Sequence, residues 1–167
     1  TEISLLVGGE PLYEKDGAEI SGFKTTVPAL LTRSIGLGGD SRVIFEEGEL
    51  MIGPQREGPS VLLGGERVTP TDAVAILKDV PFGDRERALQ ALAKLGGENG
   101  LTVKELAERI VTLFCQKVAA AINEVYLYLN SRPVYTVSEV LAPSDLKPVK
   151  ITGMGGPAEY FIPLIAK

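Results

Sequence analysis

Two glycine-rich turns carry the residue types of this chain that are best suited to holding a charged ligand. The first is residues 36–41 (GLGGDS), where Gly38 and Gly39 precede Asp40. Glycine has no Cβ, so the backbone can come close to a ligand, and successive amides can form a concavity that holds an anion. Asp40 is a candidate magnesium ligand, directly or through water. A hairpin corner or a bulge explains the same residues without any ligand.

The second turn is residues 153–158 (GMGGPA), between an expected strand at 147–152 and an expected helix at 159–167. A helix N-terminus favours phosphate or ribose oxygens because its amides and dipole face the ligand. The turn also fits the loose dinucleotide-binding pattern G-x-G-x-x-A. That pattern needs an acidic residue about 20 positions later, which lies beyond Lys167. By itself, the pattern is weak.

A third cluster favours a structural role. Gly64 and Gly65 are typical of a turn, and Asp72 lies in the first turn of an expected helix, where a carboxylate stabilises the helix dipole. Asp72 is nevertheless a second candidate for magnesium. The single cysteine, Cys115, falls in an apolar stretch and is expected in the core.

Composition excludes several classes of function. The 167 residues include no histidine, which removes Ser-His-Asp triads, Cys-His pairs and histidine-based zinc sites. The net charge of −5 argues against a nucleic-acid or anionic-membrane partner. One cysteine indicates a reducing compartment, and apolar stretches shorter than about 20 residues predict no membrane span. We therefore expect a cytoplasmic protein.

The elements that must position the two turns follow from hydrophobic period and capping residues. Residues 1–65 read as β-hairpins, beginning with a buried strand at 2–7. Residues 69–131 read as helices that begin at the caps Thr69, Asp84 and Thr102. The second runs to about Leu95, where Gly96 and Gly97 stop it, and the last ends near residue 130. Residues 134–141 read as a strand or short helix, and 147–167 as a strand, turn and helix. We expect one α/β domain over 1–167, a mixed sheet flanked by helices, cut at both ends from a longer protein.

In this order, the segments resemble the hydantoinase/oxoprolinase family, a branch of the actin-like ATPase superfamily. Residues 1–5 (TEISL) are similar to the end of its phosphate motif D-x-G-G-T-x-T-D-(I/V)-S, with Glu2 in place of aspartate. Residues 35–41 match the family's (V/I)-G-x-G-G-x-S. Residues 52–73 follow its V-G-P, G-P, G-G and P-T-x-T-D-A segments, although the loop at 57–63 is shortened. Residues 153–158 resemble the strand–turn–helix that contacts adenosine in the superfamily.

The resemblance implies the second, ribonuclease-H-like lobe of a larger enzyme that uses ATP and magnesium to open a cyclic amide such as a hydantoin or 5-oxoproline. Magnesium is assigned to Asp40 from its residue type in the first turn, and the resemblance leaves the catalytic residues unassigned. The missing N-terminal lobe, a second subunit and a second copy of the chain are the implied protein partners. The implied nucleotide-binding residues are Thr1, Gly38, Gly39, Asp40, Gly153, Gly155, Gly156 and Ala158.

Three other readings stay open. A small-molecule kinase of the same superfamily differs in its substrate lobe. A regulatory or assembly module that keeps the fold without ATP turnover fits Glu2 and the shortened loop. A nicotinamide-binding domain ranks last, because residues 1–65 are rich in hairpins and lack alternating strands and helices.

Overall fold

The computed structural model describes residues 1–14, 17, 19–20, 23–131 and 147–166. Residues 134–141, predicted as a strand or short helix, lie outside these ranges. The chain divides into two compact units, Thr1–Ile35 and Gly36–Lys167. This division differs from the expected single domain, and its boundary falls just before the first glycine turn.

The first unit is built from short antiparallel pairs. Strands β1 (Glu2–Ser4) and β8 (Thr32–Ser34) pair, as do β2 (Leu6–Val7) with β3 (Glu10–Pro11), β4 (Tyr13–Glu14) with β7 (Ala29–Leu30), and β5 (Glu19–Ile20) with β6 (Phe23–Lys24). The prediction of a buried strand at 2–7 is wrong: the segment is split at Leu5, and Leu6 and Val7 are 64% and 48% exposed. Among the described side chains of this unit, no large hydrophobic one is fully buried.

The second unit opens with the hairpin β9 (Val43–Glu46) and β10 (Glu49–Ile52). Its two-residue loop, Glu47-Gly48, has positive φ at both positions (52° and 83°), as in the tight turns that match strand twist. A 3-10 turn, η1 (Val61–Leu63), precedes α1 (Pro70–Lys78), α2 (Arg85–Gly97), α3 (Val103–Asn130) and α5 (Ala158–Ile165).

The predicted helix starts are confirmed by their caps. Thr69 and Asp72 form a capping box with Pro70 at the first helical position, and Thr102 forms one with Glu105. The Asp84 side chain accepts from the Arg87 amide at the start of α2. These caps satisfy amides that otherwise lack intrahelical partners.

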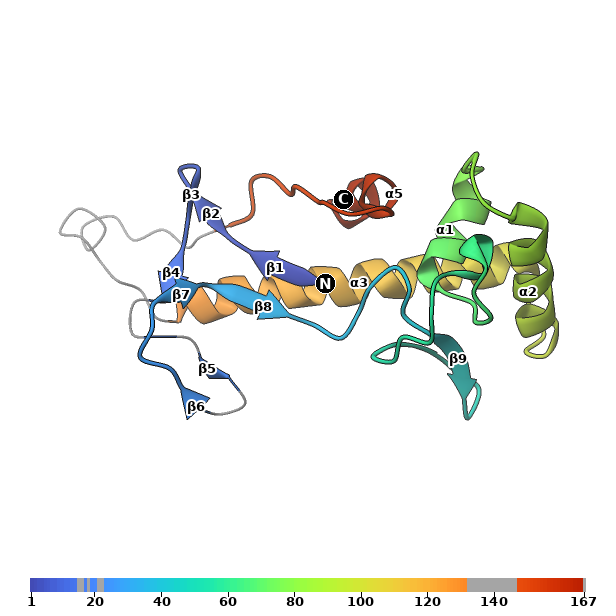
Figure 1. Cartoon of the computed structure of the whole chain (residues 1–167), viewed down its shortest axis with the longest axis horizontal. Helices are drawn as coiled ribbons and strands as arrows, with labels where there is room; N and C mark the ends of the chain where they lie inside the picture. Colours follow the sequence, from blue (N-terminus) through green and yellow to red (C-terminus); the bar gives the residue numbers. More distant parts are fainter. Residues whose placement is uncertain (15–16, 18, 21–22, 132–146, 167) are drawn as a thin grey trace. The chain divides into compact units, whose positions relative to one another are not determined.

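Helix α3 forms the centre of the core. Figure 1 shows it as the long yellow-to-orange helix with α1 and α2 packed beside its first turns. Its buried face repeats at helical spacing through Leu106, Ala107, Ile110, Val111, Phe114, Val118, Ala121 and Val125. On α5, Phe161 packs on Phe114, with ring centroids 4.2 Å apart and planes inclined by 34°. This contact anchors the helix that follows the second glycine turn.

By length and composition alone, α3 could cross a membrane, contrary to the expectation that no apolar stretch of the chain is long enough. In the structure, 39% of its most apolar window is buried. A core helix of a soluble protein passes the same test, so the finding carries little weight by itself.

The mixed α/β class is confirmed, but the single mixed sheet is not. In the part of the chain that the structure describes, every ladder is antiparallel and two-stranded. The predicted strand at 147–152 is wrong, because these residues have no regular structure and Val149 is 98% exposed. The helix predicted after the turn is confirmed as α5.

Candidate functional site

The first glycine turn is closed by Ser41, whose side chain is buried. The Gly38 amide donates to Ser41 Oγ at 2.9 Å, and the Ser41 amide donates back to the Gly38 carbonyl at 3.1 Å. These two hydrogen bonds fold residues 38–41 into one compact turn.

Thr71, in the first turn of α1, fixes this glycine turn from one side. Its amide and its hydroxyl both donate to the Gly39 carbonyl, at 2.9 and 2.8 Å. The carbonyl therefore has both of its lone pairs engaged by one residue.

The second glycine turn leads directly into α5. The Ala158 amide donates to the Gly155 carbonyl at 3.1 Å, and the amides of Tyr160 and Phe161 donate to the Pro157 carbonyl. Gly155 has φ = +113°, which side-chain-bearing residues rarely adopt. The turn thus needs glycine at position 155 for conformation, before any ligand is considered.

The two turns, which are distant in sequence, meet at Gly39. A Cβ placed on Gly39 would stand 2.6 Å from Thr71 Oγ1 and 2.7 Å from Pro157 Cγ, too close for any real side chain. Gly39 is therefore the position that lets α1, the first turn and the second turn pack together.

Other glycines of these turns face open space. A Cβ on Gly38, Gly155 or Gly156 would meet no atom within 4 Å. The amides of Gly39, Asp40, Gly155 and Gly156 donate to no acceptor among the described residues. Both turns thus present open backbone whose donors lack acceptors among the described residues, which suits an anionic or polar ligand.

A sequence profile of the hydantoinase/oxoprolinase family matches residues 1–167. The chain belongs to the hydantoinase/oxoprolinase family. This membership confirms the resemblance carried by the glycine turns. No curated protein sequence shows significant similarity to the chain.

Two solved structures show the same fold as this family member. The nucleotide-free structure of acetone carboxylase, from work on ATP-dependent acetone carboxylation, has a TM-score of 0.66 and 20% identity over 75% of this chain and 20% of its own. The ATP-dependent caprolactamase from Pseudomonas jessenii has a TM-score of 0.59 and 26% identity over 68% of this chain and 18% of its own. The chain thus spans about a fifth of the length of these proteins.

The two carboxylates considered for magnesium in this family member differ sharply. Asp40 is partly exposed and forms an ion pair with Arg56 at 2.9 Å. Asp72 is fully buried, and its oxygens accept from the amides of Val61, Leu62 and Thr69 and from the Thr69 hydroxyl. Asp72 therefore joins a loop to a helix and is not available to a metal.

In the described part of the chain, no three His, Cys, Asp or Glu side chains gather into a metal-binding group. Magnesium commonly takes one or two protein carboxylates and completes its shell with phosphate and water. The turns offer Asp40 as one such carboxylate, so this chain by itself does not supply a complete magnesium site among its described residues.

Thr1 belongs to the first unit, where it extends the β1–β8 ladder. Its amino group donates to the Ile35 carbonyl at 3.1 Å, and the Ile35 amide donates to the Thr1 carbonyl at 2.9 Å. Its assignment to the nucleotide stays a prediction.

Sequence reasoning missed Thr71 and Pro157. Thr71 lies inside the P-T-x-T-D-A segment, but its partner Gly39 is 32 positions away, so no local signal reveals the contact. The sequence indicates Pro157 only as part of a turn. The close packing of Pro157, in the second glycine turn, against Gly39, in the first, can be seen only in the folded chain.

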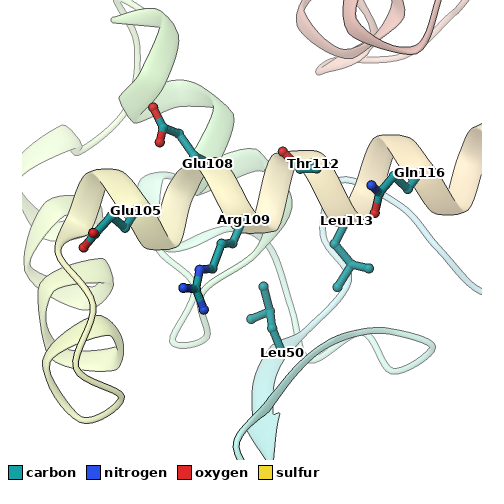
Figure 2. A pocket seen from close by; sticks show the side chains of 7 residues that line it. All are labelled: Leu50, Glu105, Glu108, Arg109, Thr112, Leu113 and Gln116. Carbon is teal, nitrogen blue, oxygen red and sulfur yellow. The ribbon is translucent and has the colours of Figure 1, made fainter.

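A surface hollow of about 410 Å³ lies between β10 and α3. In Figure 2 the side chains of Arg109 and Leu113 extend toward Leu50, whereas Glu108 points away. Its lining combines leucine, an arginine and two glutamates and contains no residue of either glycine turn. We assign it no part in the site.

Proposed function

We propose that this chain is the nucleotide-contacting, ribonuclease-H-like second lobe of a larger ATP-dependent enzyme that opens a cyclic amide of the hydantoin or 5-oxoproline type. The observation that carries the proposal is the meeting of the two glycine turns at Gly39 and Pro157. Membership of the hydantoinase/oxoprolinase family supports it.

The open faces of the turns fit a nucleotide. The first turn offers the amides of Gly39 and Asp40 for phosphate oxygens, and the second offers Gly155 and Gly156 next to the start of α5 for the adenosine end. Gly153 and Ala158 support the second turn through α5, since a Cβ on Gly153 would collide with Ile162. We include Thr1 among the nucleotide-binding residues because residues 1–5 resemble the end of the family's phosphate motif.

When bound, ATP supplies the phosphoryl group that converts an amide oxygen into a better leaving group. The residues of this chain bind and orient the nucleotide, and closure of the two lobes excludes bulk water. Asp40 is proposed to reach magnesium directly or through water, which requires its carboxylate to exchange Arg56 for the cation.

The substrate class rests on the family and on one relative. Caprolactamase is named for a lactam, which is a cyclic amide, and its name also states ATP dependence. We propose a soluble cytoplasmic enzyme whose remaining lobes, a second subunit or a second copy complete the active site.

A small-molecule kinase of the same superfamily is the nearest alternative, and it would bind nucleotide in the same way. The non-catalytic module, in contrast, would not bind the nucleotide in this way. Glu2 and the shortened loop at 57–63 are the residues that favour the module.

The test is calorimetric titration of magnesium-ADP into the full-length protein and into Gly38→Ala and Gly156→Ala variants. Both glycines face open space and have ordinary φ, so the methyl group costs little stability and occupies ligand space. Gly155 is a poor reporter, because its positive φ strains any substitution. Gly97→Ala on α2 is the matched control, since that position is equally open and lies far from the turns in sequence.

We expect wild type and Gly97→Ala to bind alike and both turn variants to lose about tenfold or more in affinity, because a methyl group prevents close backbone approach. Unchanged affinity in both turn variants would contradict the assignment. Absence of ADP binding by folded wild type would favour the non-catalytic module. In a separate assay with magnesium-ATP, release of phosphate on addition of a hydantoin or 5-oxoproline, without a phosphorylated product, separates the hydrolase from the kinase.

A further inference from the structure

The Gly39–Asp40 peptide bond is the point where Thr71 of α1 holds the first glycine turn. Its carbonyl accepts from both the amide and the hydroxyl of Thr71, at 2.9 and 2.8 Å. Thr71 is 7% exposed, so water does not compete strongly for these hydrogen bonds. Two short bonds from one buried residue fix the orientation of this peptide plane.

A trans peptide unit is planar, and the carbonyl of one residue points opposite to the amide of the next. The Gly39–Asp40 bond is trans. With the Gly39 carbonyl directed at Thr71, the Asp40 amide is directed away from α1. That amide donates to no acceptor among the described residues.

Gly39 itself permits this arrangement. Any side chain at position 39 would collide with Thr71 Oγ1 and with the ring of Pro157. The peptide is therefore enclosed on the side of Thr71 and Pro157, whereas neighbouring Gly38 faces open space.

We propose that Thr71 is a positioning residue that aims the Asp40 amide at a phosphate group of the nucleotide. The inference rests on the proposed function and deepens it. The Asp40 backbone then contributes a hydrogen bond to an anion, a role separate from any role of the Asp40 carboxylate. A hydrogen bond to a charged acceptor is stronger than a neutral one, so its orientation matters. Thr71 does not contact the nucleotide.

The test compares ADP with adenosine, each titrated into the full-length protein as wild type, Thr71→Val, Thr71→Ser and Thr112→Val. Valine keeps the shape of Thr71 and its backbone amide but removes the hydroxyl donor, and serine restores the donor. Thr112 is an exposed threonine of α3 and serves as the matched control.

We expect Thr71→Val to weaken ADP binding about fivefold, the size of one ordinary hydrogen bond, and to leave adenosine binding within about twofold. Thr71→Ser and Thr112→Val are expected to bind both ligands like wild type. An equal loss for ADP and adenosine, or no loss for ADP, would overturn the positioning role. If wild type binds adenosine but not ADP, the positioning role of Thr71 is also overturned, whereas the proposed adenosine contact is retained. A wild type that binds neither would overturn the proposed function itself.

A second measurement covers the case in which Thr71→Val does not fold. In wild type labelled with 15N-aspartate, the Asp40 amide proton should move downfield when ADP binds, and much less when adenosine binds. An Asp40 amide that responds equally to both ligands, or to neither, would overturn the inference.

Discussion

The ring of Pro157 lies where a side chain at Gly39 would have to stand, with its Cγ 2.7 Å from the position of a Cβ on Gly39. Thr71 Oγ1 occupies the other side of the same space, at 2.6 Å. Gly39 and Pro157 thus join two segments from opposite ends of the second unit.

Replacing Gly39 by alanine should therefore destabilise the protein. The methyl group must displace Thr71 or Pro157, and overpacking of this kind costs about 1–3 kcal/mol. Gly38→Ala is the control, because a Cβ there meets nothing within 4 Å, and its cost should stay below about 1 kcal/mol. Urea unfolding midpoints measure both. Equal midpoints for the two variants would contradict the packing described here.

Replacing Asp72 by asparagine should cost about 2 kcal/mol or more. Asp72 is fully buried, and its two oxygens receive three amides and one hydroxyl, whereas asparagine turns an NH₂ group toward some of these donors. Asp79→Asn is the matched control. Asp79 is exposed, pairs with Arg85 at the surface, and has φ = 53°, a conformation that asparagine adopts readily.

For Asp79→Asn we expect a change within about 0.5 kcal/mol. Thermal melting of both variants under one buffer condition makes the comparison. If Asp72→Asn melts with wild type, the buried carboxylate does not hold η1 to α1.

Glu105 should make the stability of the α3 start depend on pH. Hydrogen bonds from the backbone and side chain of Thr102, with a smaller contribution from Arg109, lower the pKa of Glu105 from its ordinary value of 4.5. Because the pKa is lower in the folded protein, the carboxylate's contribution is fully present above pH 4.5. It is lost as the pH falls through the folded pKa.

NMR titration of Glu105 should give a pKa below 4.5, and Glu105→Gln should remove this part of the acid dependence while keeping an acceptor for Thr102. A folded-state pKa at or above 4.5 would contradict the capping-box geometry.

The parts of the fold that the sequence predicts are those controlled by neighbouring residues. Thr69, Asp84 and Thr102 mark helix starts because a cap acts on amides two or three positions away. The end of α2 differs by two residues from the prediction, which places it at about Leu95, whereas the helix runs to Gly97. Gly96 and Gly97 stay helical, and Gly96 is needed because a Cβ there would stand 2.7 Å from the Leu101 carbonyl oxygen. Helix α2 ends at Gly97, and the turn that follows contains Gly100 with φ = +68°.

The parts that the sequence does not predict depend on distant partners. The apolar run at residues 2–7 forms a buried strand only if another segment covers it, and the described residues supply no such cover. The mixed polar and apolar segment 147–152 likewise has no partner strand among the described residues. Both glycine turns were recognised from composition. Their contact through Gly39, Thr71 and Pro157 was not, because nothing local to either turn encodes the other.

The hydrogen bonds from the Val61 and Leu62 amides to Asp72 limit where the preceding loop can vary in length. The carboxylate fixes the chain at η1, so residues inserted or removed at Gly58 and Pro59 lie before that fixed point and after residues 55–57, which bond to Arg42 and Asp40. Surface loops tolerate such changes at small entropic cost. Between Val61 and Asp72, by contrast, one added residue would shift the register of the donors against the carboxylate. The shortening at 57–63 can therefore be taken up at Gly58 and Pro59, which leaves α1 and the first glycine turn unchanged.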